Sequence, residues 1–321
     1  MTIWPVFGEV DSQPLHRSMS CWHSSLSPSA IALYGRRMVV TEDRVLRAMT
    51  DDASFRVMTA ITTNTVAEVM KRQNPPSDEM ARLGDLLTGT ILIRETMSPN
   101  LRVQGILRGA GGKGTLVADS HPDGTARGLV SLPQGMTSLP AGSGATLMMM
   151  RTLPNGKLHQ GMVSYDSNAN VSEALMRYMQ ESEQIKTMID VACVVEQEQV
   201  VAAGGFIVQL LPELTESQLA IMTERLSDFP PMGKLLRNEA TASQVLDELL
   251  YAMPNTRLGD SPLRFDCKCS QTRVVASLAT LDRNELGNLL TDGHPIEICC
   301  DFCGKEYAIT AEQVRGLLRE S

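Results

Sequence analysis

Between residues 43 and 212, some segments alternate apolar and polar residues as strands do, and others repeat apolar residues at helical spacing. The segment Phe55–Thr62 is rich in β-branched residues and partly alternates, which predicts a strand. Residues 64–72 and 77–95 have helical spacing. The second helix follows Pro75-Pro76 and carries Asp78 and Glu79 in its first turn, as helix starts commonly do.

Short strands separated by turns come next. We predict them over residues 101–107, 114–119, 126–132, 146–152 and 158–165. The turn sequences Pro122-Asp123-Gly124 and Pro154-Asn155-Gly156 suit antiparallel hairpins. A helix over 172–183 and strands near 189–196 and 200–210 complete the run. This order, with strands in succession and helices at either end, indicates an α+β core domain over residues 41–212.

The pattern changes to helix alone between residues 213 and 263. Two segments, Thr215–Gln218 and Thr241–Gln244, fit the capping-box pattern, and apolar stripes at helical spacing follow each of them. Helices this short are not stable alone and need a surface on which to dock. A core helical hairpin and a conditional linker between two domains both fit this segment.

Residues 1–40 show no sustained helical or strand periodicity. They contain both tryptophans and the Ser-rich stretch 24–29, so we predict a disordered extension. A natural start at Met38 would also explain the segment.

Composition narrows the class of protein. The 321 residues suggest about two domains, and 43% apolar residues are enough for a core. A net charge of −8 argues against general binding to nucleic acid backbones. The longest apolar runs fall far short of the ~20 residues of a membrane helix, and no signal segment opens the chain. We therefore expect a cytoplasmic protein with no nucleic acid partner and no membrane association.

The seven cysteines are clustered. Five of them lie in the last 55 residues, and in a reducing compartment such a cluster points to metal or redox chemistry. Two cysteines stand apart, one in the N-terminal segment (Cys21) and one in an apolar strand (Cys193). We expect Cys193 to be a small buried hydrophobic residue.

Four of these cysteines have the spacing of a metal site. Cys267-Lys268-Cys269 is followed after 30 residues by the pair Cys300 and Cys303, and Gly304 lets the chain turn behind that pair. Two such pairs can converge on a tetrahedral zinc site. The module over residues 264–321, with helices predicted at 282–290 and from Thr310, is too short for a large core. Zinc would supply on the order of 10 kcal/mol or more of its folding free energy.

The spacing leaves the role of this zinc site open. It suits a permanent zinc knuckle. It equally suits a switch, because thiolates remain oxidisable and disulfides would destroy the ligand set.

The cysteine spacing at the C-terminal end resembles that of the bacterial redox-regulated holdase chaperones, the thirty-three-kilodalton heat-shock protein family. The resemblance covers about residues 43–315. Further matching stretches are Arg47–Asp52, Ser54–Val57, Gly112–Asp119, Ser182–Ile185, Ala202–Phe206 and Leu211–Glu213.

The resemblance implies an α+β core, a metastable helical linker (213–263) and a redox-switch zinc domain (264–321). It implies that Cys267, Cys269, Cys300 and Cys303 bind Zn²⁺ when reduced and pair as Cys267–Cys269 and Cys300–Cys303 when oxidised. It further implies an ATP-independent holdase, not an enzyme, that binds unfolded client proteins and is dimeric in its oxidised form.

This chain departs from the family pattern in two places. Cys299 directly precedes Cys300; it could serve as an alternate ligand, but zinc normally closes at four ligands, so we expect it to be a passenger. Residues 1–40 have no identifiable counterpart.

Two other functions compete with this interpretation. A thiol–disulfide oxidoreductase would carry Cys300 and Cys303 at a helix N-terminus in a βαβ setting, and a zinc-ribbon nucleic-acid module would need a basic face. The glycine-rich stretch 109–114 lacks phosphate-loop spacing and is expected to be a hairpin turn. His121, His159 and His294 are isolated in sequence.

Overall fold

The computed structural model describes residues 42–140, 142–153, 155–165, 170–279, 281 and 296–320. The described residues belong to two compact units, a larger one that ends at Cys267 and a smaller C-terminal one that begins at Lys268. The predicted N-terminal extension and the helix predicted at 282–290 lie outside the described residues.

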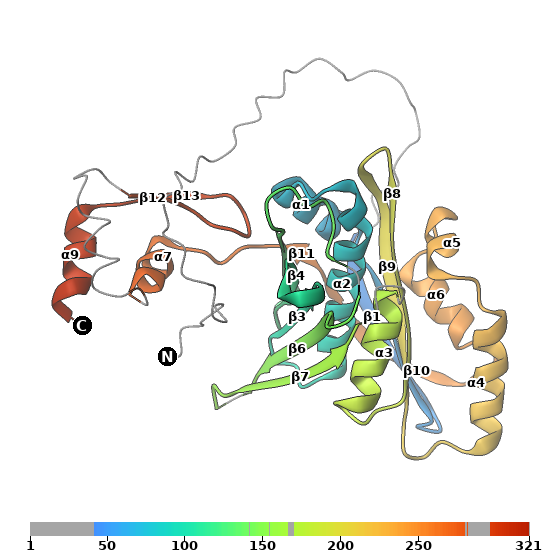
Figure 1. Ribbon diagram of the computed structural model, residues 1–321. Coiled ribbons are helices and arrows are strands. Elements are labelled where there is room, and N and C mark those ends of the chain that lie inside the picture. Colours follow the sequence, from blue (N-terminus) through green and yellow to red (C-terminus); the bar gives the residue numbers. More distant parts are fainter. Residues whose placement is uncertain are drawn as a thin grey trace. The chain divides into compact units, whose positions relative to one another are not determined.

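Two sheets frame the larger unit (Figure 1). The first, here called sheet A, is antiparallel throughout and has the strand order β10-β1-β2-β9-β8. Its strands are β1 (Arg44–Thr50), β2 (Phe55–Ile61), β8 (Thr187–Glu196), β9 (Gln199–Leu210) and β10 (Asn255–Pro262).

The second sheet, here called sheet B, has the order β11-β5-β4-β3-β6-β7. Its strands are β3 (Val103–Arg108), β4 (Thr115–Ser120), β5 (Thr125–Ser131), β6 (Thr146–Thr152), β7 (Leu158–Ser164) and β11 (Arg264–Phe265). The short β11 runs parallel to β5, whereas the other pairs are antiparallel. The stretch 109–114 forms the predicted hairpin turn between β3 and β4, where the Gly109 N–H donates to the Gly114 carbonyl at 3.2 Å.

Three helices fill the space between the sheets (Figure 1). They are α1 (Thr63–Gln73), α2 (Ser77–Thr96) and α3 (Val171–Glu181), and each contacts strands of both sheets. Their apolar side chains form the main core, with Leu83, Leu87 and Leu175 fully buried. Gly84 lets α2 approach β8, because a Cβ atom there would lie 2.5 Å from Cys193 Sγ.

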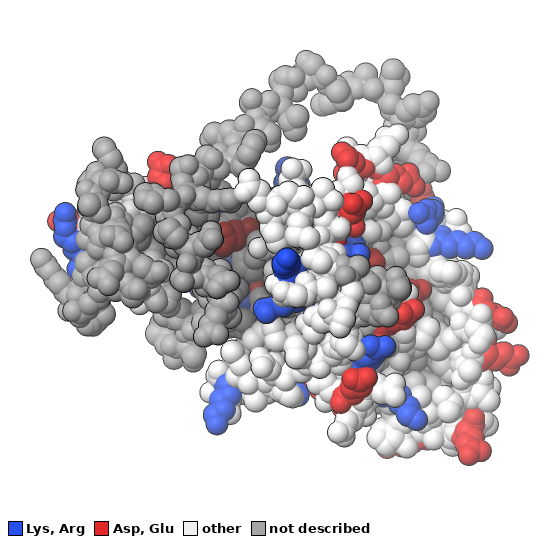
Figure 2. Space-filling model, viewed as in Figure 1, with Lys and Arg blue, Asp and Glu red and all other residues white. Residues whose placement is uncertain are grey.

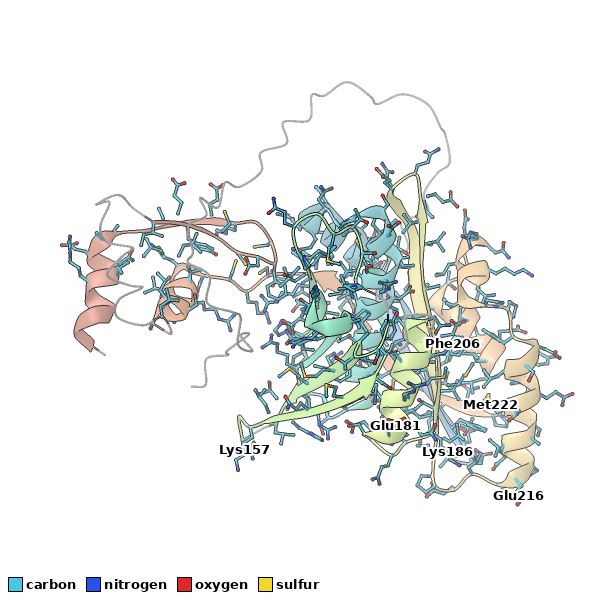
Figure 3. All side chains as sticks on the ribbon, viewed as in Figure 1. Lys157, Glu181, Lys186, Phe206, Glu216 and Met222 are labelled. Atoms are coloured by element: carbon cyan, nitrogen blue, oxygen red, sulfur yellow. The ribbon has the colours of Figure 1, made fainter. Side chains whose placement is uncertain are left out.

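The opposite face of sheet A has a separate apolar cover. It consists of α4 (Glu216–Asp228), α5 (Met232–Arg237) and α6 (Ala242–Leu249). Because successive strand residues point to opposite faces, Val57 and Phe206 pack against this cover while Met58 and Ile207 face the main core. Figure 3 labels Phe206 on β9 and Met222 on α4, which belong to this second cluster.

The structure confirms the two predicted capping boxes of this cover, at Thr215 and Thr241. It corrects the expectation that residues 213–263 are helix alone. Residues 255–262 form β10, which pairs with β1 as an edge strand of sheet A. An exposed edge strand is polar and lacks a strong alternating pattern, so residues Asn255–Pro262 gave no strand signal.

The C-terminal unit is small. Its described elements are α7 (Gln271–Leu278), β12 (Ile296–Cys299), β13 (Glu306–Ile309) and α9 (Ala311–Glu320). The helix α9 was expected after Thr310, whereas α7 and the antiparallel pair β12–β13 were not predicted. The predicted α+β class is confirmed. No helix in the described ranges is both long and apolar enough to cross a membrane.

Candidate metal centre

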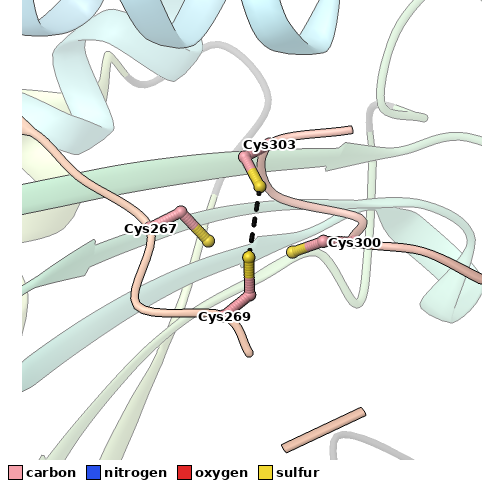
Figure 4. Close-up of side chains that lie close together, drawn as sticks. All are labelled: Cys267, Cys269, Cys300 and Cys303. Carbon is pink, nitrogen blue, oxygen red and sulfur yellow. Dashed lines mark hydrogen bonds between the residues drawn. The ribbon is translucent and has the colours of Figure 1, made fainter. Parts of the chain in front are cut away.

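The structure brings together the four cysteines that the sequence singled out. The sulfur atoms of Cys267, Cys269, Cys300 and Cys303 all lie within 4.8 Å of one another (Figure 4). Tetrahedral zinc with Zn–S bonds near 2.3 Å separates its sulfur ligands by about 3.8 Å. The four thiols therefore fit a Zn²⁺ ion in number, chemistry and spacing.

The backbone around the second pair forms a tight knuckle. The strands β12 and β13 lead into and out of it. The Cys303 and Gly304 N–H groups both donate to the Cys300 carbonyl, at 3.2 and 2.8 Å, and the Cys300 N–H donates to the Lys305 carbonyl at 2.9 Å. Gly304 has a φ of +71°, a conformation that glycine adopts without strain. This confirms the turn expected at Gly304.

The first pair lies between two structured segments. Cys267 follows β11 by two residues, and Ser270 caps the N-terminus of α7 by accepting a hydrogen bond from the Arg273 N–H. Cys269 Sγ reaches across to Cys303 Sγ at 3.4 Å. Cys267 and Cys269 therefore lie in a short segment between strand β11 and the capped helix α7.

Two side chains donate hydrogen bonds to sulfur atoms of this group. The Tyr307 hydroxyl donates to Cys269 Sγ at 3.0 Å, and that bond raises the pKa of Tyr307. Arg127 Nη1 donates to Cys267 Sγ at 3.4 Å. Sequence analysis missed both residues. Tyr307 lies near the second pair in sequence, but Arg127 is separated from Cys267 by 140 residues, so only the fold could reveal it.

A buried carboxylate lies beside Arg127. Asp119 is fully buried and forms ion pairs with Arg102 and Arg127. Burial alone would raise the pKa of Asp119, but hydrogen bonds from His121 and Arg102 and the charges of both arginines hold it well below its usual range. His121, which looked isolated in sequence, is therefore part of an ionic cluster in sheet B.

The remaining cysteines lie outside the group of four. Cys193 is buried on β8, and burial raises the pKa of its thiol to about 12, which agrees with the expected role as a small hydrophobic residue. Cys299 is the last residue of β12 and is not a member of the group. Cys21 lies outside the described residues.

The geometry argues against the two competing functions. Cys300 and Cys303 lie in a turn between two strands rather than at the start of a helix, which is where a low-pKa redox cysteine would be expected. Among the described residues on the face shown in Figure 2, acidic and basic side chains are interspersed.

Together, these features define a class of protein in which a two-sheet α+β core is followed by a group of four cysteines that could hold a metal ion. The family model described as Hsp33 protein matches residues 43–310. The chain therefore belongs to the Hsp33 family, which confirms the resemblance inferred from the cysteine spacing.

Individual relatives agree with this assignment. The 33 kDa chaperonin of Syntrophotalea carbinolica is 30% identical over 287 residues, covering 86% of this chain and 99% of the relative. The 33 kDa chaperonin of Bacillus subtilis is 28% identical over 286 residues, covering 86% and 98%. The crystal structure of the 33 kDa chaperonin from Thermotoga maritima has the same fold, with a TM-score of 0.74 at 22% identity and coverage of 87% and 99%.

Proposed function

We propose that this protein is a redox-regulated holdase that binds unfolding proteins in the cytoplasm and prevents their aggregation under oxidative stress. Membership of the Hsp33 family supports a chaperone function. One observation carries the redox part of the proposal. The group of four cysteines begins directly after the segment 213–263, whose helices cover an apolar face of sheet A.

In the reduced state, Cys267, Cys269, Cys300 and Cys303 would hold Zn²⁺ as four thiolates. A bound Zn²⁺ ion would offset two of the four negative charges and so allow the four thiolates to stay together. The thiolates join the C-x-C segment to the knuckle between β12 and β13. The C-terminal unit is thereby kept folded at the end of the segment that covers sheet A.

Oxidation would remove the ligand set. Four thiolates, two molecules of hydrogen peroxide and four protons yield two disulfides and four molecules of water. The thiolates lose four electrons, and the peroxides gain them. The pairs would be Cys267–Cys269 and Cys300–Cys303, so that no thiolate remains to hold the metal.

The outer face of sheet A is the surface that activation would expose. Four large apolar side chains of this face, Phe55, Val57, Phe206 and Val208, are buried beneath the helical cover. If α4–α6 detached, these side chains would form a contiguous apolar patch of the kind that binds unfolded proteins. No catalytic step is needed for holding, and we propose that the oxidised form is a homodimer.

The attachments of the cover to sheet A are few. Met222 is the one residue of α4 that is buried. Three polar contacts join α5 and α6 to sheet A. The Thr59 hydroxyl donates to the Ala242 carbonyl at 2.8 Å, the Met232 N–H donates to Asp190 Oδ2 at 2.8 Å, and Arg257 on β10 pairs with Asp247 on α6. A cover held in this way can open without disturbing the core between the sheets.

The test measures zinc content and suppression of client aggregation on the same samples. Purified full-length protein is assayed reduced, and again after hydrogen peroxide at mildly raised temperature, with heat-unfolded citrate synthase as the client. We expect one zinc per chain and little activity before oxidation, then zinc release together with strong suppression of aggregation. Retained zinc, or zinc release without suppression, contradicts the proposal.

Matched cysteine variants locate the switch. Cys300→Ser should abolish stable zinc binding and the response to peroxide. Cys193→Ala changes a buried free cysteine outside the group of four, and it should respond as the unmodified protein does. Turnover of insulin disulfides by the unmodified protein would instead support an oxidoreductase, and salt-sensitive binding of DNA or RNA a nucleic-acid module.

A further inference from the structure

The ionic cluster in sheet B reaches the metal centre through one side chain. We propose that Arg127, oriented by Asp119, is a positioning residue through which the core stabilises Cys267 as a metal-bound thiolate, and that this contact controls how readily zinc is lost and Cys267 is oxidised. This inference rests on the proposed zinc site.

The backbone places Arg127 and Cys267 side by side. The parallel pair β5–β11 aligns Arg264 with Thr125 and Phe265 with Ala126. Hydrogen bonds from the Arg264 N–H to the Gly124 carbonyl, at 3.1 Å, and from the Asp266 N–H to the Ala126 carbonyl, at 3.3 Å, extend this register at both ends. Strand pairing within the larger unit therefore places Cys267 next to Arg127.

Asp119 determines where the guanidinium of Arg127 points. Arg127 Nε donates to Asp119 Oδ2 at 2.9 Å, and its Nη1 donates to Cys267 Sγ at 3.4 Å. Asp119 is fully buried, and the Arg127 side chain is only 13% exposed. A guanidinium can make both contacts at once because its donors form a rigid planar fork.

A second arginine keeps Asp119 paired independently of Arg127. Arg102 holds Asp119 in a bidentate contact, with Nε and Nη2 donating to the two carboxylate oxygens at 2.6 and 2.7 Å. Removal of the Arg127 charge would therefore not leave a buried carboxylate without a partner. This allows the contact with Cys267 to be tested without loss of the fold.

The expected effect follows from the charge of the metal centre. Four thiolates around Zn²⁺ carry a net charge of −2, and a donated N–H from a cation stabilises that charge on Cys267 in particular. Loss of such outer contacts to a metal ligand typically weakens metal binding by about 10- to 100-fold. The thiolate left without its donor is also more nucleophilic toward peroxide.

The experiment compares full-length, reduced, zinc-loaded proteins by two readouts. Competition with the chelator 4-(2-pyridylazo)resorcinol gives the zinc affinity. Mass spectrometry gives the rate at which each of the four cysteines is oxidised by peroxide. Arg127→Gln should weaken zinc binding by about tenfold or more and accelerate oxidation of Cys267 more than that of Cys303. Arg127→Lys keeps the charge but cannot make both contacts, so it should give a smaller change in the same direction.

Arg151→Gln is the matched control. Arg151 lies on β6 of the same sheet, is 22% exposed and pairs with Glu183 at 2.8 Å, so its loss also breaks a partly buried ion pair. It should leave zinc affinity and all four oxidation rates unchanged.

Two outcomes overturn the inference while leaving the proposed function intact. One is an Arg127→Gln protein that behaves like Arg151→Gln while the unmodified protein still releases zinc on oxidation. The other is equal acceleration at all four cysteines, which would mean general destabilisation rather than positioning of Cys267. A reduced, unmodified protein that binds no zinc would instead refute the proposed function itself.

Discussion

The core between the two sheets and the core of the C-terminal unit differ in how much apolar surface they bury. Almost every residue of α2 from Leu83 to Ile93 is buried against one sheet or the other. In the described part of the C-terminal unit, the buried residues are Leu278, Tyr307, Ile309 and Val314. The first region buries enough apolar surface to fold on that basis, whereas under the proposed function the second would depend on a bound ion.

The helical cover of sheet A falls between these two extremes. Its helix α6 buries Val245, Leu246 and Leu249, but α4 buries only Met222. The cover packs on sheet A, which also borders the main core, and no described strand lies on the outer side of the cover. The three regions therefore form a series of decreasing apolar burial. Under the proposed function, the stability of the last region would depend on a metal ion.

The largest expected effect is that of removing the metal. Chelation of zinc under reducing conditions should unfold the C-terminal unit, because structural zinc in small domains contributes on the order of 10 kcal/mol. Amide hydrogen exchange should lose protection in β12, β13 and α7 while α2 keeps its protection. Adding zinc back should restore the protection of β12, β13 and α7. Full protection of β12 and β13 in the reduced, metal-free protein would contradict the comparison.

Truncation of a buried leucine should have different effects on the two sides of sheet A. Leu87→Ala, between the sheets, should lower the free energy of unfolding of the whole larger unit by about 2–5 kcal/mol in urea titrations. Leu246→Ala, under the cover, should act first by detaching α4–α6. It should raise binding of a hydrophobic dye and suppress client aggregation without peroxide.

Both leucines are fully buried, so the pair is matched in size and exposure. If Leu246→Ala lowered global stability as much as Leu87→Ala and left dye binding unchanged, the cover and the core would be one cooperative unit.

The main core should also show a pH dependence that arises from Asp85 on α2. Burial raises the pKa of Asp85 to about 7, and its Oδ1 atom is buried without a hydrogen-bond partner among the described residues. A folded-state pKa above the unfolded value favours the protonated form. The stabilisation is therefore complete below about pH 4 and is lost as the pH rises toward 7.

Asp85→Asn tests this assignment. Urea titrations at pH 5 and pH 7.5 should show a decrease of about 1–4 kcal/mol with rising pH in the unmodified protein. The decrease should be markedly smaller in the variant. An equal decrease in both proteins would assign the pH dependence to other groups.

Much of the fold was predictable because its elements have strong local signals. Strands such as Phe55–Ile61 alternate between two apolar environments, and α1, α2 and α3 carry helical periods, so their boundaries were found to within a few residues. The polar edge strand β10 and the four-residue strands β12 and β13 have too little pattern for this. Their pairing depends on partners elsewhere in the chain.

The four cysteines of the candidate metal centre were predictable because their signal is local in sequence. The side chains around them were not, because those contacts depend on the fold. Cysteine spacing is local within each pair and chemically specific, so the four cysteines of the candidate metal centre could be named. Arg127, which is paired with Asp119, reaches Cys267 only because β11 pairs with β5. The contact between Arg127 and Cys267 joins residues 140 positions apart, so the spacing of residues in the sequence could not predict it.

The smallest expected effect concerns the caps of the helical cover. The Thr241 hydroxyl accepts the Gln244 N–H at 3.2 Å in the capping box of α6, and Thr215 plays the same role for α4. Thr241→Ala should cost about 1 kcal/mol of helix stability, which corresponds to roughly fivefold faster hydrogen exchange in α6. Thr215→Ala should accelerate exchange in α4 instead.

These two variants test whether the cover opens helix by helix. If it does, Thr241→Ala lowers the temperature at which peroxide activates the protein, because α6 carries most of the buried side chains and the Thr59 hydrogen bond. Thr215→Ala then has the smaller effect, since Met222 is the one buried residue of α4. Equal acceleration of exchange in α2 by either variant would show that the cover cannot open without the main core.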